Sequence, residues 1–287
     1  MVKPLEGAMQ RLAVGLAGLL LTVFTTVGAA APPSAQPSLQ FDGSSYIEVP
    51  DSSDFSVSAT AGLTISAWMR PDVLSFSASE GSGYVYWLGK GERGQQEWVF
   101  RMYSANNTEH RANRISFYLF NSQGGLGIGS YFQDPITPGE WIHVVGVADT
   151  ERTAIYKNGV FRKCDQYRGS GDGSCQQYRD LSIAPQHGTA PLRMGTRDFG
   201  SYFQGGLAEV RIWNRALAGD EIAELYATDT VPPNGLVAEY LLTEGAGSVA
   251  HDTLGDHDGT IVGATWSIAA STVAGHAVPS SHGWHPW

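Results

Sequence analysis

Residues 205–226, GGLAEVRIWNRALAGDEIAELY, change their hydrophobic period once, and this change restricts what the chain can fold into. Residues 207–213 alternate with a period of two, which predicts a β-strand. Its two faces are then Ala208, Val210 and Ile212 against Leu207, Glu209, Arg211 and Trp213. From residue 214 onward the period becomes helical. A strand, a tight corner and a helix are therefore expected in this order.

The predicted helix is short. Ile222, Leu225 and Tyr226 share one stripe, and the acidic Asp220 and Glu221 lie in the first turn, where they favour the helix dipole. We predict Ala218 as the N-cap, with Glu221 at the reciprocal position of a capping box.

Length and composition favour one main β domain. The 287 residues contain 35 Gly, 11% aromatic and only 16% charged side chains, which suits many short strands and turns. The formal charge is −10, with 18 Lys and Arg against 28 Asp and Glu, and no basic cluster stands out. Nucleic acid and anionic lipid are therefore excluded as expected partners, because both require concentrated positive charge.

The first 31 residues have the layout of a secretory signal peptide. Lys3 and Arg11 precede an apolar run over residues 12–27, which is followed by small residues. The run is short for the ~20 residues of a membrane anchor, so we expect removal of residues 1–31 and a secreted or extracellular protein with no membrane contact. Residues 32–38 are a Pro/Ser linker. Export also favours a disulfide between the only two cysteines, Cys164 and Cys175.

Four runs carry a resemblance to a known family: FDGSSYIEVP (41–50), LTISAWMRP (63–71), WIHVVGVAD continuing to YKNG (141–159), and residues 205–226. Together they resemble the laminin-G-like, concanavalin A-like jelly rolls. The resemblance implies an all-β, two-sheet antiparallel jelly-roll sandwich with a short capping helix over residues 39–230. Further strands are expected at 84–89, 98–103, 114–120, 126–132, 141–149 and 153–157, a spacing typical of a sandwich.

The C-terminal part resembles, over residues 235–266, the segment that usually opens a laminin-G-like domain. Either the fold is circularly permuted, with residues 231–268 completing the same sandwich, or a second domain begins there. We favour the first alternative, because an isolated hairpin is marginal in water. Residues 269–287, rich in His and Trp, are expected to be a disordered tail, and metal binding there is less favoured because no strand surrounds its imidazoles.

No catalytic residues are predicted. Glycosidases on this sandwich need two carboxylates on one strand face, whereas Asp149 and Glu151 straddle a predicted turn. His143 has the chemistry of a general base, but its place in a core strand favours a structural role. No nucleotide-binding loop or zinc-protease motif is present. These patterns favour a protein that is not an enzyme, and no cofactor is certain.

Calcium is a hypothesis from the resemblance. Laminin-G-like domains often hold a rim Ca²⁺ through the turn after the first strand and through an acidic pair before V-R-I. Asp42 and Glu209 match these positions, but Ala208 replaces the second carboxylate of the pair, which removes one oxygen ligand.

Sugar binding needs exposed rings, and four aromatic residues are the predicted ligand-binding residues: Tyr131, Tyr202, Trp98 and Trp87. The two tyrosines stand in a repeated GSYFQ segment. The leading hypothesis is a secreted, non-catalytic module that binds a neutral or weakly polar polysaccharide. The alternatives are an extracellular protein-binding or adhesion module without sugar specificity, and a polysaccharide hydrolase or lyase. The sequence does not fix the ligand or the oligomeric state.

Overall fold

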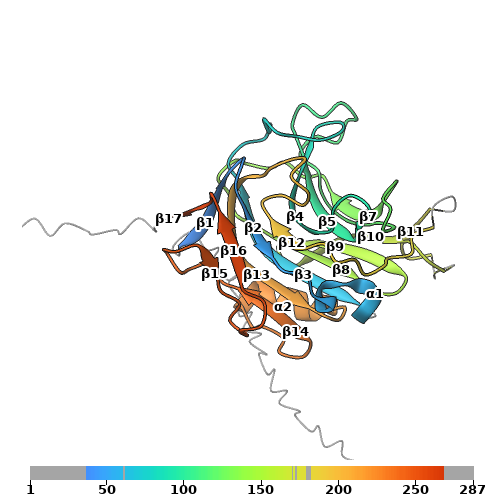
Figure 1. The fold of residues 1–287 in the computed structure, drawn as a ribbon. Helices are drawn as coiled ribbons and strands as arrows, with labels where there is room; N and C mark the ends of the chain where they lie inside the picture. The colour runs from blue at the N-terminus through green and yellow to red at the C-terminus, as the bar shows by residue number, and fades with distance from the viewer. Residues whose placement is uncertain (1–36, 61, 170, 172, 179–181, 268–287) are drawn as a thin grey trace, which may run out of the picture.

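Alternating apolar side chains build two sheets that pack face to face, as Figure 1 shows. The computed structural model describes residues 37–60, 62–169, 171, 173–178 and 182–267. The predicted all-β, two-sheet sandwich with one capping helix is confirmed. The predicted signal peptide (1–31) and tail (269–287) lie outside the described residues. Within the described ranges, no helix has the length and apolar character needed to cross a membrane.

The larger sheet has nine strands, in the order β11-β10-β9-β8-β3-β13-β1-β17 with β14 also paired to β13. All its pairs are antiparallel except β10 with β11. The strands are β1 (Ser38–Asp42), β3 (Leu63–Pro71), β8 (Ile142–Ala148), β9 (Arg152–Lys157), β10 (Val160–Gln166), β11 (Gln176–Gln177), β13 (Gln204–Trp213), β14 (Leu236–Tyr240) and β17 (Thr265–Ser267).

The smaller sheet has eight strands, in the order β15-β16-β2-β12-β4-β5-β6-β7. They are β2 (Tyr46–Val49), β4 (Tyr84–Lys90), β5 (Trp98–Tyr103), β6 (Ile115–Leu119), β7 (Ile128–Phe132), β12 (Leu192–Met194), β15 (Val249–Ala250) and β16 (Gly259–Val262). Two short elements, a 3-10 turn at Ser53–Phe55 and α1 (Val57–Thr60), follow β2.

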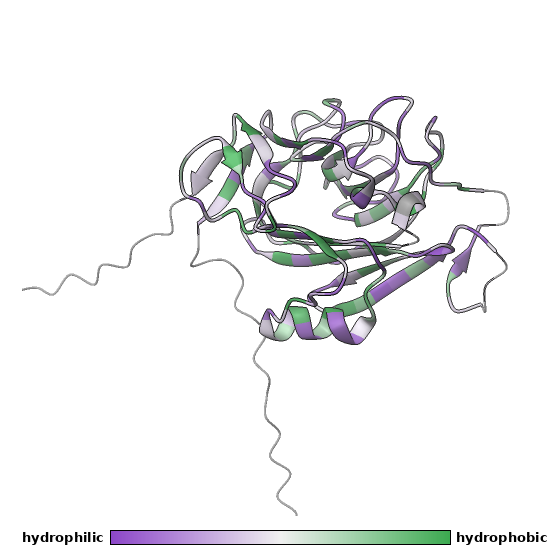
Figure 2. Cartoon of the chain, turned by 60° about the horizontal axis from the view of Figure 1, so that its bottom comes forward, coloured by the Kyte–Doolittle hydropathy of each residue, from purple (hydrophilic) through white to green (hydrophobic). Residues whose placement is uncertain are grey.

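The main core lies between the sheets, and most strands contribute alternate side chains to it. In β2, Ile47 and Val49 are buried while Tyr46 and Glu48 are partly exposed, as the sequence predicts. The hairpin between β9 and β10 turns at Asn158 and Gly159, both with positive φ (52° and 75°), which suits the predicted Asn-Gly turn. Figure 2 shows hydrophobic colour along the strands of both layers.

The alternation predicted for β13 is wrong at its first residues. Leu207, predicted to face away from Val210, lies in the main core with Val210 and Ile212. The reason is a β-bulge: the pairing with β3 shifts between Ala208 and Arg211, and Glu209 adopts a φ of 49°. The bulge places one extra residue in β13, so the alternation of core-facing side chains shifts by one position.

The helix α2 (Gly219–Thr228) covers the outer face of the larger sheet (Figures 1 and 2). Ile222 and Leu225 pack with Trp213, Val145 and Leu217 in a second, smaller core. The predicted N-cap, Ala218, is confirmed. Its backbone N–H donates to Glu221 at 2.9 Å, but Ala218 has no side-chain acceptor, so only half of a capping box forms.

The C-terminal strands pair with strands from the beginning and the middle of the chain. β14 pairs with β13, β16 with β2, and β17 with β1, so the blue and red ends of the described chain lie side by side in Figure 1. These strands belong to the two sheets described above rather than to a sheet of their own.

The predicted disulfide is present. Cys164 in β10 and Cys175, eleven residues later and directly before β11, are joined.

Candidate functional site

The outer face of strands β4 to β7 carries arginine and tyrosine side chains. In β5 and β6, Phe100, Met102 and Phe117 point into the core, so the residues next to them, among them Arg101 and Tyr118, point out of the sandwich. The strand register places the outward residues of adjacent strands side by side.

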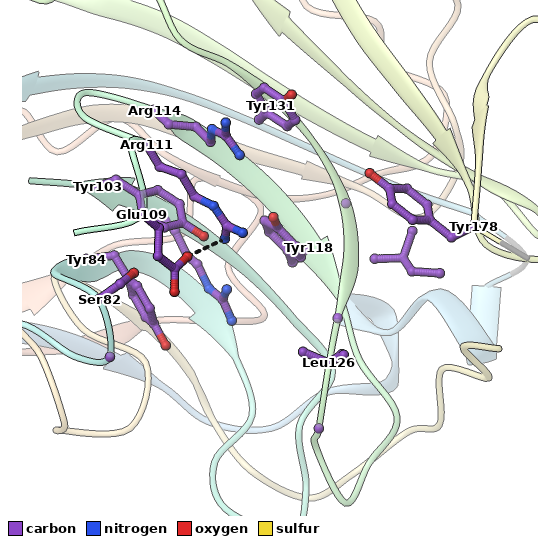
Figure 3. Close-up of a pocket in the computed structure, with 16 residues that line it drawn as sticks. Ser82, Tyr84, Tyr103, Glu109, Arg111, Arg114, Tyr118, Leu126, Tyr131 and Tyr178 are labelled. Carbon is purple, nitrogen blue, oxygen red and sulfur yellow. Dashed lines mark ion pairs between the residues drawn. The ribbon is translucent and has the colours of Figure 1, made fainter. Parts of the chain in front are cut away.

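A hollow of about 470 Å³ opens over this face. It is bordered by the sheet, by the loops at residues 81–82, 109–114 and 125–127, and by Tyr178, which follows β11 (Figure 3). Its side chains are Ser82, Tyr84, Arg101, Tyr103, Glu109, Arg111, Arg114, Tyr118, Leu126, Ile128, Tyr131 and Tyr178. Leu126 is 74% exposed and Tyr178 39% exposed, so both side chains are open to a ligand at the rim of the hollow.

Arg101 stands at the floor of the hollow among four aromatic rings. Its guanidinium carbon is 4.7 Å from the ring centre of Tyr84, 4.6 Å from Tyr118, 5.4 Å from Tyr86 and 5.2 Å from Phe120. Cation–π contact therefore holds the side chain in place. The Nε atom of Arg101 is buried and has no hydrogen-bond partner among the described residues.

Tyr131 forms another wall, and cations already cover its ring. The guanidinium carbon of Arg114 lies 3.7 Å from the ring centre, and Nζ of Lys163, which comes from β10, lies 4.2 Å from it. Arg114 also donates two hydrogen bonds to the side chain of Gln133. The ring thus positions positive charge at the mouth of the hollow.

The electrostatic balance of the hollow is positive. Within the described residues, Arg101, Arg111 and Arg114 face a single lining carboxylate, that of Glu109, which pairs with Arg111 at 3.0 Å. Burial alone would raise the pKa of the Tyr103 hydroxyl, but the charges of Arg101 and Arg111 outweigh burial and lower that pKa below its ordinary value. A developing negative charge is therefore stabilised here.

The predicted ligand-binding residues are dispersed. The prediction that Trp87 and Trp98 lie on a binding surface is wrong. Both side chains are fully buried in the main core. The reason is a bulge at Trp87 in β4 and the inward orientation of Trp98 in β5. Tyr131 does line the hollow. Tyr202 does not line it: it stands before β13, and its backbone N–H donates to the carbonyl of Ala78.

The predicted calcium pair is not brought together. Asp42 is opposite Gln204 in the pairing of β1 with β13, and Glu209 is five residues further along β13, which is roughly 16 Å at the rise of a strand. Asp42 accepts hydrogen bonds from Ser44, and Glu209 pairs with Arg211 at 3.3 Å. Over the described ranges, no group of three or more His, Cys, Asp or Glu side chains could hold a metal ion.

His143 is a core residue. It is 2% exposed, its Nε2 contacts Ser66 Oγ at 2.7 Å, and its ring packs between Trp68 and Tyr226 beneath α2. Burial, reinforced by the charge of Arg211, lowers its pKa to about 3. The imidazole is therefore neutral and inaccessible, as a structural role requires.

A second polar cluster contains a serine, a histidine and an aspartate, the residue types of a catalytic triad, but its serine is closed to solvent. Ser56 Oγ lies 2.8 Å from Nδ1 of His187, whose Nε2 lies 3.7 Å from Asp51. Ser56 is fully buried and its hydroxyl also donates to Glu97, which pairs with the buried Lys90 at 2.5 Å. No substrate can reach the hydroxyl, so the cluster serves to fix the loop before β12 to the sheet.

Sequence reasoning missed the three arginines, Tyr178 and Leu126. The outward position of Arg101 follows from the alternation of WVFRMY in β5. The sequence shows no basic cluster, because Arg101, Arg111 and Arg114 are separated by loop residues and come together only through the β5–β6 hairpin.

Comparison with known proteins identifies the family of the chain and structures with a similar fold. The chain matches the family model of the concanavalin A-like lectin/glucanases superfamily over residues 41–223. A candidate carbohydrate-binding protein from Bacteroides ovatus has a similar structure, with 18% identity and a TM-score of 0.55. That match covers 83% of this chain but 61% of the Bacteroides protein.

Two further structures are more distant. The heptameric SAP-like pentraxin from Limulus polyphemus is 14% identical with a TM-score of 0.49, over 81% of this chain and 98% of that one. Domain 4 of the arabinanase AbnA from Geobacillus stearothermophilus, solved with arabinotriose, is 16% identical with a TM-score of 0.38, over 58% and 66%. A search of the curated proteins found no match. Because the family model covers more than half of its residues, the chain belongs to the concanavalin A-like lectin/glucanases superfamily.

Proposed function

We propose that the protein binds glycans in the hollow over strands β4 to β7. The observation that carries this proposal is the lining itself: tyrosine rings, hydroxyl groups and guanidinium donors converge on one open concavity of about 470 Å³. Sugars are recognised by such mixtures, in which rings contact the C–H faces and fixed polar groups bond the hydroxyls. The Bacteroides ovatus protein named above has the same fold, and its proposed carbohydrate binding is compatible with this function.

The site is proposed to bind without catalysis. Of the residues that the structure describes, the one carboxylate that lines the hollow is Glu109, and it is paired with Arg111, whereas glycoside hydrolysis requires two carboxylates at a defined separation. The disulfide between Cys164 and Cys175 supports a place of action outside the reducing cytoplasm. A secreted recognition module remains the leading hypothesis.

A glycan array tests the proposal. The wild-type protein should retain at least one class of polysaccharide, and Tyr178→Ala should weaken that binding by about fivefold, equivalent to roughly 1 kcal/mol for one lost ring contact. Tyr178 is exposed and outside the regular strands, but its hydroxyl contacts Asp165 and Lys163, so the melting curve of Tyr178→Ala is recorded beside its binding and must be native for the comparison.

The matched control is Phe161→Ala, which removes a ring that is more exposed than Tyr178, at 51% against 39%, and that does not line the hollow. It should leave binding unchanged. An array with no bound glycan would reject the proposal in favour of protein binding or adhesion. Release of reducing ends or unsaturated products from the same polysaccharides would show a hydrolase or lyase instead.

A further inference from the structure

We infer that the glycan bound in the hollow is anionic, and that the guanidinium groups of Arg101, Arg111 and Arg114 pair with its carboxylate or sulfate groups. This inference rests on the proposed glycan binding and narrows its substrate class. It replaces the neutral or weakly polar polysaccharide that the sequence suggested.

The local charge is the first argument. The whole chain has a formal charge of −10, yet the charged residues that line the hollow, among those that the structure describes, are three arginines and one glutamate. Glu109 pairs with Arg111, and no ion pair joins Arg101 or Arg114 to a carboxylate in the described part of the chain. Positive charge gathered in a concavity of an acidic protein attracts anions and focuses the field on them.

The unpartnered donor of Arg101 is the second argument. Its Nε atom is buried without a hydrogen-bond partner among the described residues, and Arg101 lines the hollow. Leaving buried polar groups unpaired is unfavourable, and an incoming acceptor recovers that loss. Such acceptors are the oxygens of a carboxylate or sulfate.

The stacking geometry is the third argument. The guanidinium carbon of Arg101 lies 4.7 and 4.6 Å from the ring centres of Tyr84 and Tyr118, and these cation–π contacts hold the group in place. A guanidinium held in this way presents its N–H edge, and that edge matches the two oxygens of a carboxylate or sulfate. The guanidinium of Arg101 is thus held in place for binding an oxyanion before the ligand arrives.

The same contacts argue against a neutral sugar. Cations from Arg114 and Lys163 occupy the ring of Tyr131, at 3.7 and 4.2 Å from its centre, so that ring is not free to stack on a pyranose. Of the tyrosines lining the hollow, Tyr178 is the most open to solvent. Ring stacking alone therefore offers little surface, whereas the guanidinium groups of Arg101 and Arg114 are paired with no carboxylate of the described residues.

Matched polysaccharide pairs test the inference by isothermal titration calorimetry. Polygalacturonate is compared with fully methyl-esterified pectin, and dextran sulfate with dextran, so each pair differs only in charge. We expect binding of at least one anionic member, at least tenfold tighter than its neutral partner, and weaker at high salt because ions screen the pairing. Preference for polygalacturonate or for dextran sulfate identifies a carboxylate or a sulfate as the recognised group.

Variants locate the contact. Arg111→Gln and Arg114→Gln should each weaken anionic binding about tenfold, and Glu109→Gln should strengthen it, because it removes a carboxylate that lines the hollow and pairs with Arg111. The control Arg93→Gln removes an equal charge from an exposed residue that does not line the hollow, and it should change nothing. Arg101→Gln is informative only if its melting curve is native, and the other two variants keep the test decisive.

The outcomes separate the two proposals. Equal or tighter binding of the neutral members would overturn the anionic inference and leave glycan binding intact. Anionic binding that Arg111→Gln and Arg114→Gln do not weaken would also overturn it, because the contact would lie elsewhere. No binding to these polysaccharides or to the wider array would reject glycan binding itself.

Discussion

Leu207 and Val210 point into the same core, although they lie three residues apart in one strand. Strict alternation would place them on opposite faces of the sheet. Glu209, between them, has a φ of 49°, in the left-handed region that side chains other than glycine rarely adopt. The bulge that joins the two halves of β13 therefore depends on a strained residue.

The strain at Glu209 is testable by a pair of substitutions. Glu209→Gly and Glu209→Ala both remove the carboxylate that pairs with Arg211, and they differ in the ease with which they accept a positive φ. We expect Glu209→Gly to be the more stable of the two by about 1 kcal/mol, measured by urea unfolding. Equal midpoints would show that Glu209 is not strained in the folded protein.

The cap of α2 offers a stabilising change. Ala218→Ser adds the side-chain acceptor that the N-cap lacks and completes the capping box with Glu221, so we expect about 0.5–1 kcal/mol of added stability. The control is Ala223→Ser, at an exposed position inside the helix, where serine should be slightly destabilising. A lower unfolding midpoint for Ala218→Ser would place the start of the helix elsewhere.

His143 makes stability depend on pH. Its folded pKa of about 3 lies below the ordinary value near 6.5 because the ring is buried. Between these values the unfolded chain binds a proton that the folded chain does not, so stability falls as the pH falls below 6.5. This residue alone should remove about 2 kcal/mol between pH 7 and pH 5.

The variant His143→Gln isolates this contribution. Glutamine does not titrate and retains a polar group near Ser66, so the variant should lose about 2 kcal/mol less than the wild type between pH 7 and pH 5. Urea unfolding at the two pH values measures the difference. Parallel losses in both proteins would mean that His143 takes up a proton in the folded state.

The disulfide should contribute measurably to stability. Cys164 and Cys175 close a loop with a sequence separation of 11 residues, worth about 3 kcal/mol in the chain-entropy model. Reduction should therefore lower the melting temperature by several degrees, and the denatured, unreduced protein should show no reactive thiol. Two titratable thiols in that sample would contradict the pairing.

The domain boundary is tested by truncation. Ending the chain after Val231 removes β14, β16 and β17, which pair with β13, β2 and β1. We expect loss of cooperative unfolding, since core apolar surface and strand edges would become exposed. Removing only residues 269–287 is the control and should leave the transition unchanged. A soluble, two-state product of the larger truncation would instead indicate a separate C-terminal domain.

Much of the fold was predictable because its signals are local. LTISAWMRP matches β3 residue for residue, and Asn158-Gly159 turns a hairpin as expected. Period-two alternation and turn residues each act within a few positions of the chain. The bulge at Glu209 was not predictable, because it depends on the pairing of β13 with β3 and leaves no local pattern.

The candidate site was predicted less well than the fold. Tyr131 lines the hollow, whereas Trp87 and Trp98 are core residues, because sequence alone does not show which side of a strand faces the second sheet. Arg101 has the alternation of an outward residue, but its partners Tyr84 and Tyr118 come from neighbouring strands. A site assembled across three strands becomes visible only with their register.

The pairing of β1 with β17 sets an order of events in folding. Ser38 is opposite Ser267, at a sequence separation of 229 residues, so this edge of the larger sheet cannot close until the C-terminal strand has been synthesised. Closing so long a segment is slow, because its entropy is lost before the contacts form. Until β17 has been synthesised, the outer edge of β1 therefore stays unpaired in the nascent chain. During that interval the chain depends on protection from aggregation.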